Sequence, residues 1–111
     1  MELSEMLVAA RANLLRAQER LNLWPDVTVF INDDFGFNLS SSQCIRKAMA
    51  DVPEPYLKCY IKPDLLRRVV SRQVHWNDCE VSGDILFDRR PNKYAPDVHT
   101  LMSFFQLPRP A

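Results

Sequence analysis

The chain of 111 residues carries 14 basic and 14 acidic side chains, so its formal net charge is zero. This length fits a single domain, and the neutral charge argues against general nucleic-acid binding, which needs an excess of Lys and Arg. A share of 47% hydrophobic residues is typical of a globular protein. The sequence has no apolar run long enough to span a membrane. Its acidic start over residues 1–5 is unlike a signal peptide.

The three cysteines, Cys44, Cys59 and Cys79, include no CxxC pair. An odd number of isolated cysteines favours reduced thiols over disulfides. We therefore expect a cytoplasmic protein.

The first predicted element is an amphipathic helix over residues 2–22. Its apolar side chains follow a three-four spacing that places them on one stripe: Leu3, Leu7, Ala10, Leu14, Ala17 and Leu21. We expect this stripe to pack against a sheet or a neighbouring domain, and a homodimer through residues 3–21 is the alternative. Trp24-Pro25-Asp26 ends the helix, since proline disfavours helical backbone in the residue before it.

Four strands are predicted next, because the apolar period changes to two. Residues 27–31 and 35–39 form a hairpin around the turn sequence Asn32-Asp33-Asp34. Residues 43–49 fit either a helix or a strand, and their position after a second turn favours a third antiparallel strand. Residues 56–61 alternate clearly enough to form a fourth.

The second half of the chain alternates between helical and extended patterns. The predicted order is a helix over residues 63–72, a polar turn at Trp76-Asn77-Asp78, a strand over residues 81–88 and a helix over residues 97–105. The chain is therefore expected to be an α+β domain, with an antiparallel sheet of about five strands and helices packed on one face.

This order and several short motifs resemble the sterol carrier protein 2-like (SCP2-like) domain. The motifs are the hairpin tip Asn32-Asp33-Asp34, the helix over residues 64–72, the Trp76-Asn77-Asp78 turn and the strand entry Ser82-Gly83-Asp84. The resemblance covers the SCP2-like region over residues 24–106, and we expect the amphipathic helix over residues 1–23 to belong to the same domain and residues 107–111 to form an irregular tail. It also implies that the space between sheet and helices can open into a tunnel for an acyl chain or a sterol.

Residues 75–105 are more closely similar to the form of this domain at the C-terminus of some metallo-β-lactamase-fold proteins, including relatives of Rieske-type sialic acid hydroxylases. The motifs that carry this likeness are the Trp76-Asn77-Asp78 turn, Glu80, Gly83 and the segment Arg89-Arg90-Pro91-Asn92-Lys93-Tyr94. The HxHxDH segment of the metallo-β-lactamase fold is absent, and so are the ligands of a Rieske cluster. The resemblance therefore implies a tail domain or a free-standing relative without metal chemistry.

Aromatic side chains are the candidates for lining an apolar cavity, although the sequence does not assign them to one face of the sheet. They are Phe30, Phe35, Phe37, Tyr56, Tyr60, Trp76 and Phe87. So many aromatic groups in a chain of this length favour a filled core over an open cavity.

Two basic pairs and one turn are the candidates for polar contacts: Arg67, Arg68, Arg89 and Arg90, with Asn77 and Asp78. If the basic pairs lie on adjacent elements, they suit an acidic partner, a phosphate or a carboxylate. The alternative is that they are solvated and matched by nearby acids. The turn residues either fix a structural corner beside the tryptophan or form a lip that contacts a ligand.

The chain offers little for catalysis or metal binding. His75 and His99 lack the short ligand spacings of a zinc site. A dyad of His75 with Cys59, Cys79 or Asp78 stays open, because such partners meet only in space. We expect no catalytic residue, no metal ion and no cofactor.

Three functions are compatible with these observations. The first is a non-catalytic accessory or interaction module, associated in cis or in trans with a metallo-β-lactamase-fold hydrolase or oxygenase. The second is a free-standing carrier of a lipid or another apolar small molecule in an internal cavity. The third is a small enzyme that uses His75 with Cys79 or Asp78. A filled core with an exposed apolar strip would favour the first over the second.

Overall fold

The computed structural model describes residues 2–33, 35–40, 44–45, 55–91 and 95–108 of the chain. Within these residues it contains four helices and five strands. In chain order they are α1 (Leu3–Leu21), β1 (Thr28–Ile31), β2 (Phe35–Asn38), β3 (Cys44–Ile45), β4 (Tyr56–Tyr60), α2 (Pro63–Val70), α3 (Trp76–Ser82), β5 (Leu86–Arg90) and α4 (Pro96–Met102).

The strands form one sheet in the order β3-β2-β1-β4-β5. β1 and β2 make the expected antiparallel hairpin, and β3 continues antiparallel to β2. β4 pairs in parallel with β1, so that Val29 lies opposite Leu57, and β5 is antiparallel to β4. The α+β class is confirmed, but the sheet is mixed, whereas an antiparallel one was expected. Side-chain alternation identifies the two faces of a strand and carries no information about its direction.

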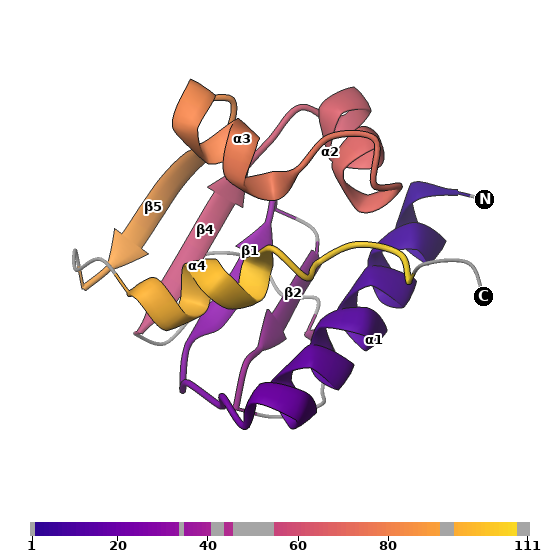
Figure 1. Ribbon diagram of the computed structural model, residues 1–111. Coiled ribbons are helices and arrows are strands. Elements are labelled where there is room, and N and C mark those ends of the chain that lie inside the picture. Colours follow the sequence, from indigo (N-terminus) through magenta and orange to yellow (C-terminus); the bar gives the residue numbers. More distant parts are fainter. Residues whose placement is uncertain (1, 34, 41–43, 46–54, 92–94, 109–111) are drawn as a thin grey trace.

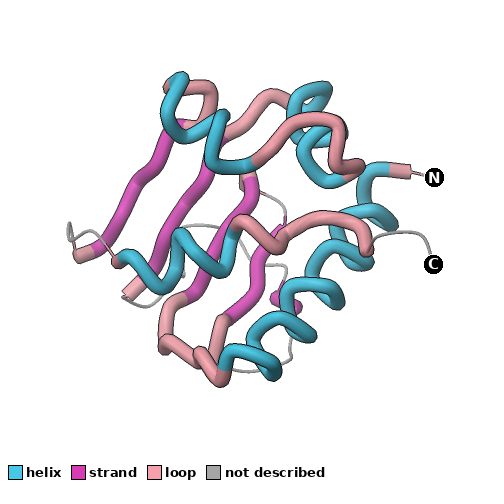
Figure 2. The backbone as a smooth tube through the Cα atoms, in the orientation of Figure 1, coloured by secondary structure: helices cyan, strands magenta, loops and turns pink. Residues whose placement is uncertain are grey.

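All four helices lie on the same side of the sheet (Figure 1), and the backbone tube shows α4 crossing in front of the strands with α1 beside it (Figure 2). The alternation along the strands explains this arrangement, because every second side chain joins one common core. The sheet residues in that core are Val29, Ile31, Phe35, Phe37, Leu57 and Cys59. The helices therefore cover one face only.

α1 packs its predicted apolar stripe into the core of its own chain. The buried members are Met6, Leu7, Ala10, Leu14 and Ala17. The helix ends at Asn22, which adopts the left-handed conformation and donates its N–H to Gln18 O. α1 also contacts α2 and α4. Four members of the stripe, Leu7, Ala10, Leu14 and Ala17, are thus packed within the molecule, whereas Leu21 is 42% exposed.

A buried polar network fastens α1 to the end of the hairpin. Arg11 donates from Nη1 to Gln18 Oε1 (2.8 Å) and from Nη2 to Asn38 O (3.3 Å). Gln18 donates from Nε2 to Leu39 O (2.6 Å) and to a second backbone carbonyl. Arg11 is 3% exposed and Gln18 is fully buried. Polar groups at such depth fix how the helix sits on the sheet, because any other position would leave them unpaired.

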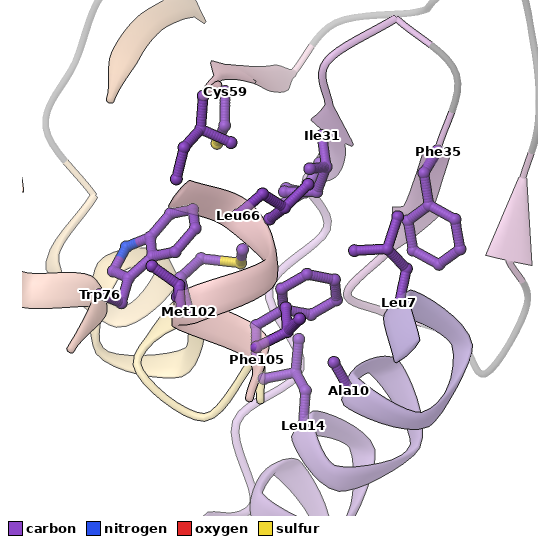
Figure 3. Close-up of a cluster of buried hydrophobic side chains, with 14 of the residues drawn as sticks. Leu7, Ala10, Leu14, Ile31, Phe35, Cys59, Leu66, Trp76, Met102 and Phe105 are labelled. Atoms are coloured by element: carbon purple, nitrogen blue, oxygen red, sulfur yellow. The ribbon is translucent and has the colours of Figure 1, made fainter. Parts of the chain in front are cut away.

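One continuous cluster of apolar side chains fills the space between helices and sheet (Figure 3). At its centre the rings of Phe37 and Phe105 stack with centroids 5.5 Å apart, and Phe35 lies 6.2 Å from Phe105. Leu66 and Met102 reach the same cluster from α2 and α4 (Figure 3). The described part of the chain thus has a packed core where the resemblance implied a tunnel.

Residues 76–82 form helix α3, where the sequence predicted a polar turn. His75 caps this helix, since its Nδ1 accepts the Asn77 backbone N–H at 3.3 Å. Gly83 ends it in the left-handed conformation (φ 78°), which glycine adopts without strain. The sequence predicts Asn77 and Asp78 as turn formers, but in the structure they occupy the first turn of a capped helix, where an acidic side chain is favourable.

The other predicted boundaries differ in smaller ways. β5 begins at Leu86 and ends at Arg90, later than the predicted strand over residues 81–88. Of the predicted third strand over residues 43–49, the structure shows β3 at Cys44–Ile45, and the rest lies outside the described residues. In the predicted tail, the Leu107 N–H donates to Val70 O at 2.7 Å, which ties the start of the tail to α2.

Candidate functional site

The aromatic residues proposed to line one cavity lie on two faces of the sheet. Those on the helix side are Phe35, Phe37, Trp76 and Phe87. The opposite face carries Phe30, which is buried, with Tyr56 and Tyr60, which are half-buried. The sheet separates the two groups, so these seven side chains do not line a common cavity.

A small pocket lies between the end of β5 and α4, and we call it the β5–α4 pocket. Its volume is about 130 Å³. Its walls are mainly apolar and include Val27, Leu57, Ala95 and Val98. Arg89, Arg90 and His99 also line it. The pocket is therefore mainly apolar and borders three residues with basic side chains.

A hydrogen-bonded cluster adjoins this pocket and joins α3 to α4. Glu80 Oε1 accepts the indole N–H of Trp76 at 2.7 Å and lies 2.7 Å from His99 Nδ1. The His99 side chain is 7% exposed and that of Glu80 is 20% exposed. The Phe87 ring packs edge-on against the imidazole, with centroids 5.2 Å apart. Because a carboxylate only accepts hydrogen bonds, Glu80 holds the proton of His99 on Nδ1.

Of the residues considered for catalysis, His75 caps α3, Asp78 and Cys79 lie within that helix, and Cys59 lies on β4. His75 is exposed, and its Nδ1 is engaged by the backbone of Asn77. Burial raises the pKa of Cys79. Burial also raises the pKa of Cys59, and the negative charge of Glu80 adds to this effect. Both thiols stay protonated near neutral pH, which makes them poor nucleophiles.

The two basic pairs lie in different parts of the fold. Arg67 and Arg68 belong to α2, which follows the end of β4, whereas Arg89 and Arg90 lie at the far end of β5 (Figure 1). Arg90 Nε is 3.7 Å from Asp88 Oδ1, and both side chains are largely exposed. Such a pair contributes little to stability. The four arginines therefore do not form the single patch considered from the sequence.

The cluster of Trp76, Glu80 and His99 is the feature that the sequence did not reveal. Trp76 and Glu80 are four positions apart, which places them on one face of a helix. This spacing indicates a contact only in a helix, and the sequence predicts a turn at Trp76-Asn77-Asp78. His99 comes from a different helix, and no spacing in the sequence indicates its contact with Glu80.

The residues found to line the β5–α4 pocket are mostly apolar. They include Tyr56 and His99 but no Ser, Cys, Asp or Glu. Over the described ranges, no three His, Cys, Asp or Glu side chains gather closely enough to hold a metal ion. No helix in the part of the chain that the structure describes has the length and apolar character needed to cross a membrane.

Comparison with known proteins finds no match to this chain among protein-family models, curated proteins or solved structures. The function therefore rests on the geometry of the residues described above.

Proposed function

We propose that this chain is a non-catalytic, SCP2-like interaction module that acts beside a metallo-β-lactamase-fold hydrolase or oxygenase, in the same protein or as a separate partner. The observation that carries the proposal is the packed core, in which aromatic rings such as Phe37 and Phe105 occupy the space between helices and sheet. A domain whose interior is filled acts through its surface. The class of partner rests on the resemblance of residues 75–105.

The order of elements supports an SCP2-like organisation. A long N-terminal helix precedes the hairpin and β4, a short helix follows, and β5 and α4 close the described chain. The helices cover one face of the sheet, as the resemblance implies (Figure 1). This agreement concerns architecture and does not depend on any ligand.

A carrier of sterol or acyl chains has weaker support. Ligand pockets for drug-sized molecules have volumes of roughly 300–1,000 Å³ and bury most of the ligand. The β5–α4 pocket, at about 130 Å³, is smaller than this range, and the larger hollows beside α2, of about 470 and 620 Å³, are open to solvent rather than enclosed. An enzyme that uses His75 with Cys79 has weaker support still, because the imidazole is bonded to backbone and the thiol stays protonated.

The surface we assign to partner contact is formed by Val81 and Leu86, on either side of Gly83. Their exposed fractions are 91% and 67%. Leu86 begins β5, the last strand in the sheet order and thus an edge strand. Exposed edge strands with apolar side chains are common places for another chain to add. We call this surface the α3–β5 edge.

The test is direct binding to purified metallo-β-lactamase-fold proteins encoded by the same genome, measured by sedimentation velocity. We expect a complex, and we expect Val81→Glu to weaken it about tenfold or more if this surface is central. Val8→Glu is the matched control, since Val8 is 51% exposed on α1 and lies away from β5. Absence of any complex, or equal weakening by both variants, would contradict the proposal.

A further inference from the structure

The outer edge of β5 carries backbone groups that the sheet does not use (Figure 1). Thr28 N–H donates to Pro55 O at 3.2 Å, and Asn32 N–H donates to Cys59 O at 2.7 Å. The odd-numbered residues of β4 therefore face β1, and its even-numbered residues bond to the even-numbered residues of β5. The N–H and C=O of Phe87 consequently point away from the sheet, and neither has a hydrogen-bond partner among the described residues.

A hollow follows this edge of the sheet. Its volume is about 340 Å³, and the residues found to line it all belong to β5: Phe87, Asp88, Arg89 and Arg90. The hollow is open to solvent, so an added chain can reach the backbone of the strand without displacing a helix.

The ring of Phe87 anchors the strand at this point. It packs edge-on against Trp76, with centroids 6.4 Å apart, and against His99, with centroids 5.2 Å apart. Trp76 and His99 are both hydrogen-bonded to Glu80. An edge that is already held in the extended form loses little freedom when another strand adds to it. The cluster of Trp76, Glu80 and His99 therefore positions the outward backbone groups of Phe87.

The side chains on the open face of β5 determine what can lie opposite them. Leu86 and Asp88 share this face, because they pair with Tyr60 and Lys58 of β4. Leu86 is 67% exposed, and together with Tyr60 and Leu65 it borders a second hollow of about 470 Å³. An apolar side chain opposite Leu86 would cover this exposed surface.

Asp88 favours a cation in the added strand. Its Oδ1 lies 3.7 Å from Arg90 Nε, and both side chains are largely exposed, so this pair contributes little. Lys58 faces Asp88 from β4, but its ammonium lies over the Tyr56 ring, 5.0 Å from the centroid. Opposite charges directly across an antiparallel pair are stabilising. A lysine or arginine opposite Asp88 would gain such a pair.

A second copy of this chain fits the edge poorly as an antiparallel strand. The register of fullest overlap sets Asp88 against the Asp88 of the other copy, and like charges directly opposite are destabilising. The next permitted register in one direction sets Leu86 against Asp88. The next register in the other direction places Pro91 across from Phe87, and proline has no N–H to donate. The sequence that fits the edge is therefore a different one.

We propose that the α3–β5 edge binds an extended segment of a partner protein as an added antiparallel strand, with a basic residue opposite Asp88 and an apolar residue opposite Leu86. The residue between them exchanges both backbone hydrogen bonds with Phe87. This inference rests on the proposed function for the partner surface, and it adds the conformation and the sequence pattern of the bound segment.

The probe is the capped peptide Ser-Thr-Arg-Val-Leu-Thr-Ser, titrated into the ¹⁵N-labelled chain and followed by amide chemical shifts. We expect saturable shifts at Leu86, Phe87 and Asp88 with a dissociation constant of about 1 mM. Hydrogen exchange of the Phe87 amide should slow in the complex. The same peptide with an N-methylated valine should bind at least about tenfold more weakly, because it cannot donate to Phe87 O.

A charge exchange tests the register. Asp88→Lys should weaken binding of the arginine peptide about fivefold and strengthen binding of the peptide that carries glutamate in place of arginine. Glu19→Lys, an equal change of charge at an exposed position of α1, should leave both affinities unchanged.

Three outcomes would overturn strand addition. They are the absence of saturable shifts up to about 20 mM peptide, far above the expected dissociation constant, equal affinity for the N-methylated peptide, or equal losses in Asp88→Lys and Glu19→Lys. If Val81→Glu weakens a complex with a metallo-β-lactamase-fold protein while the peptide results are negative, the partner surface stands and strand addition is wrong. If no such complex forms but the peptides bind as expected, strand addition stands and the class of partner is wrong.

Discussion

Two polar clusters lie inside this fold, and they differ in what surrounds them. The cluster of Arg11 and Gln18 joins α1 to the hairpin, and its acceptors include backbone carbonyls buried within the chain. The cluster of Trp76, Glu80 and His99 joins α3 to α4, and His99 also lines a pocket. The first is enclosed on all sides, whereas the second has an opening beside it.

This difference indicates separate roles. A buried network that satisfies its own groups positions one element on another and offers nothing to a ligand. A network that orients an imidazole at the wall of a pocket prepares a surface for binding. We therefore assign the α1 cluster to stability and the α3–α4 cluster to recognition, and the predictions below test that division.

The largest expected effect is on the α1 cluster. Gln18→Leu removes one acceptor of Arg11 and leaves Leu39 O without the Gln18 donor, so the free energy of unfolding should fall by about 3 kcal/mol. Urea denaturation followed by circular dichroism measures this. Glu19→Leu, the neighbouring exposed position, should change stability by less than about 0.5 kcal/mol. A loss below about 1 kcal/mol for Gln18→Leu would contradict the structural role of the network.

A smaller loss is expected at the α3–α4 cluster. Glu80→Ala leaves the Trp76 N–H and His99 Nδ1 without their shared acceptor, which should lower the free energy of unfolding by about 2 kcal/mol. The side chain is 20% exposed, so water can replace part of the lost bonding. Asp78→Ala on the same helix is the control and should cost no more than about 1 kcal/mol. Equal losses in both variants would show that the buried pairing contributes nothing.

Alkaline pH should lower the free energy of unfolding through Cys59, which lies on β4. Burial, aided by the charge of Glu80, raises the pKa of this thiol above its ordinary value of 9.0. The folded state keeps the proton that the unfolded state releases, so the stabilisation is full below pH 9 and is lost as pH rises further. The expected loss is about 1.4 kcal/mol per pH unit above 9. Cys59→Ala should reduce this slope in urea denaturation at pH 9 to 10, and an unchanged slope would disprove the assignment.

The smallest expected effect is the coupling between the two clusters. Gln18→Leu and Glu80→Ala change groups that share no hydrogen-bond partner, so their effects on the free energy of unfolding should add within about 0.5 kcal/mol. A double-mutant cycle measures the coupling. A coupling energy above about 1 kcal/mol would mean that the two networks form one unit, and the division of roles would be wrong.

The sequence predicted those elements whose apolar side chains recur at a regular spacing and face the core. The apolar stripe of α1, apart from the exposed Leu21, and the alternation along β4 both identify side chains that are buried. The parallel pairing of β1 with β4 was missed, because alternation is identical for either strand direction. Trp76-Asn77-Asp78 was missed as a helix because the cap is supplied by His75, which is not among the usual capping residues.

The candidate site was harder to predict than the fold. Arg89 and Arg90 were candidates for binding an anion, and they do line the pocket. Arg67 and Arg68 on α2, which the sequence grouped with them, lie in another part of the fold. The positions of charges in a sequence do not show which elements become neighbours. The contact between Glu80 and His99 depends on how α3 and α4 pack, and no local pattern encodes that packing.

The central claim is that the interior of this domain is filled and that it acts through its surface. The most direct test is native mass spectrometry of the protein purified from cells, followed by organic extraction. The account predicts the mass of the bare chain, 12.9 kDa, with no lipid in the extract. A stoichiometric added mass that extracts as a sterol or a long acyl chain would contradict the packed core and would favour the carrier.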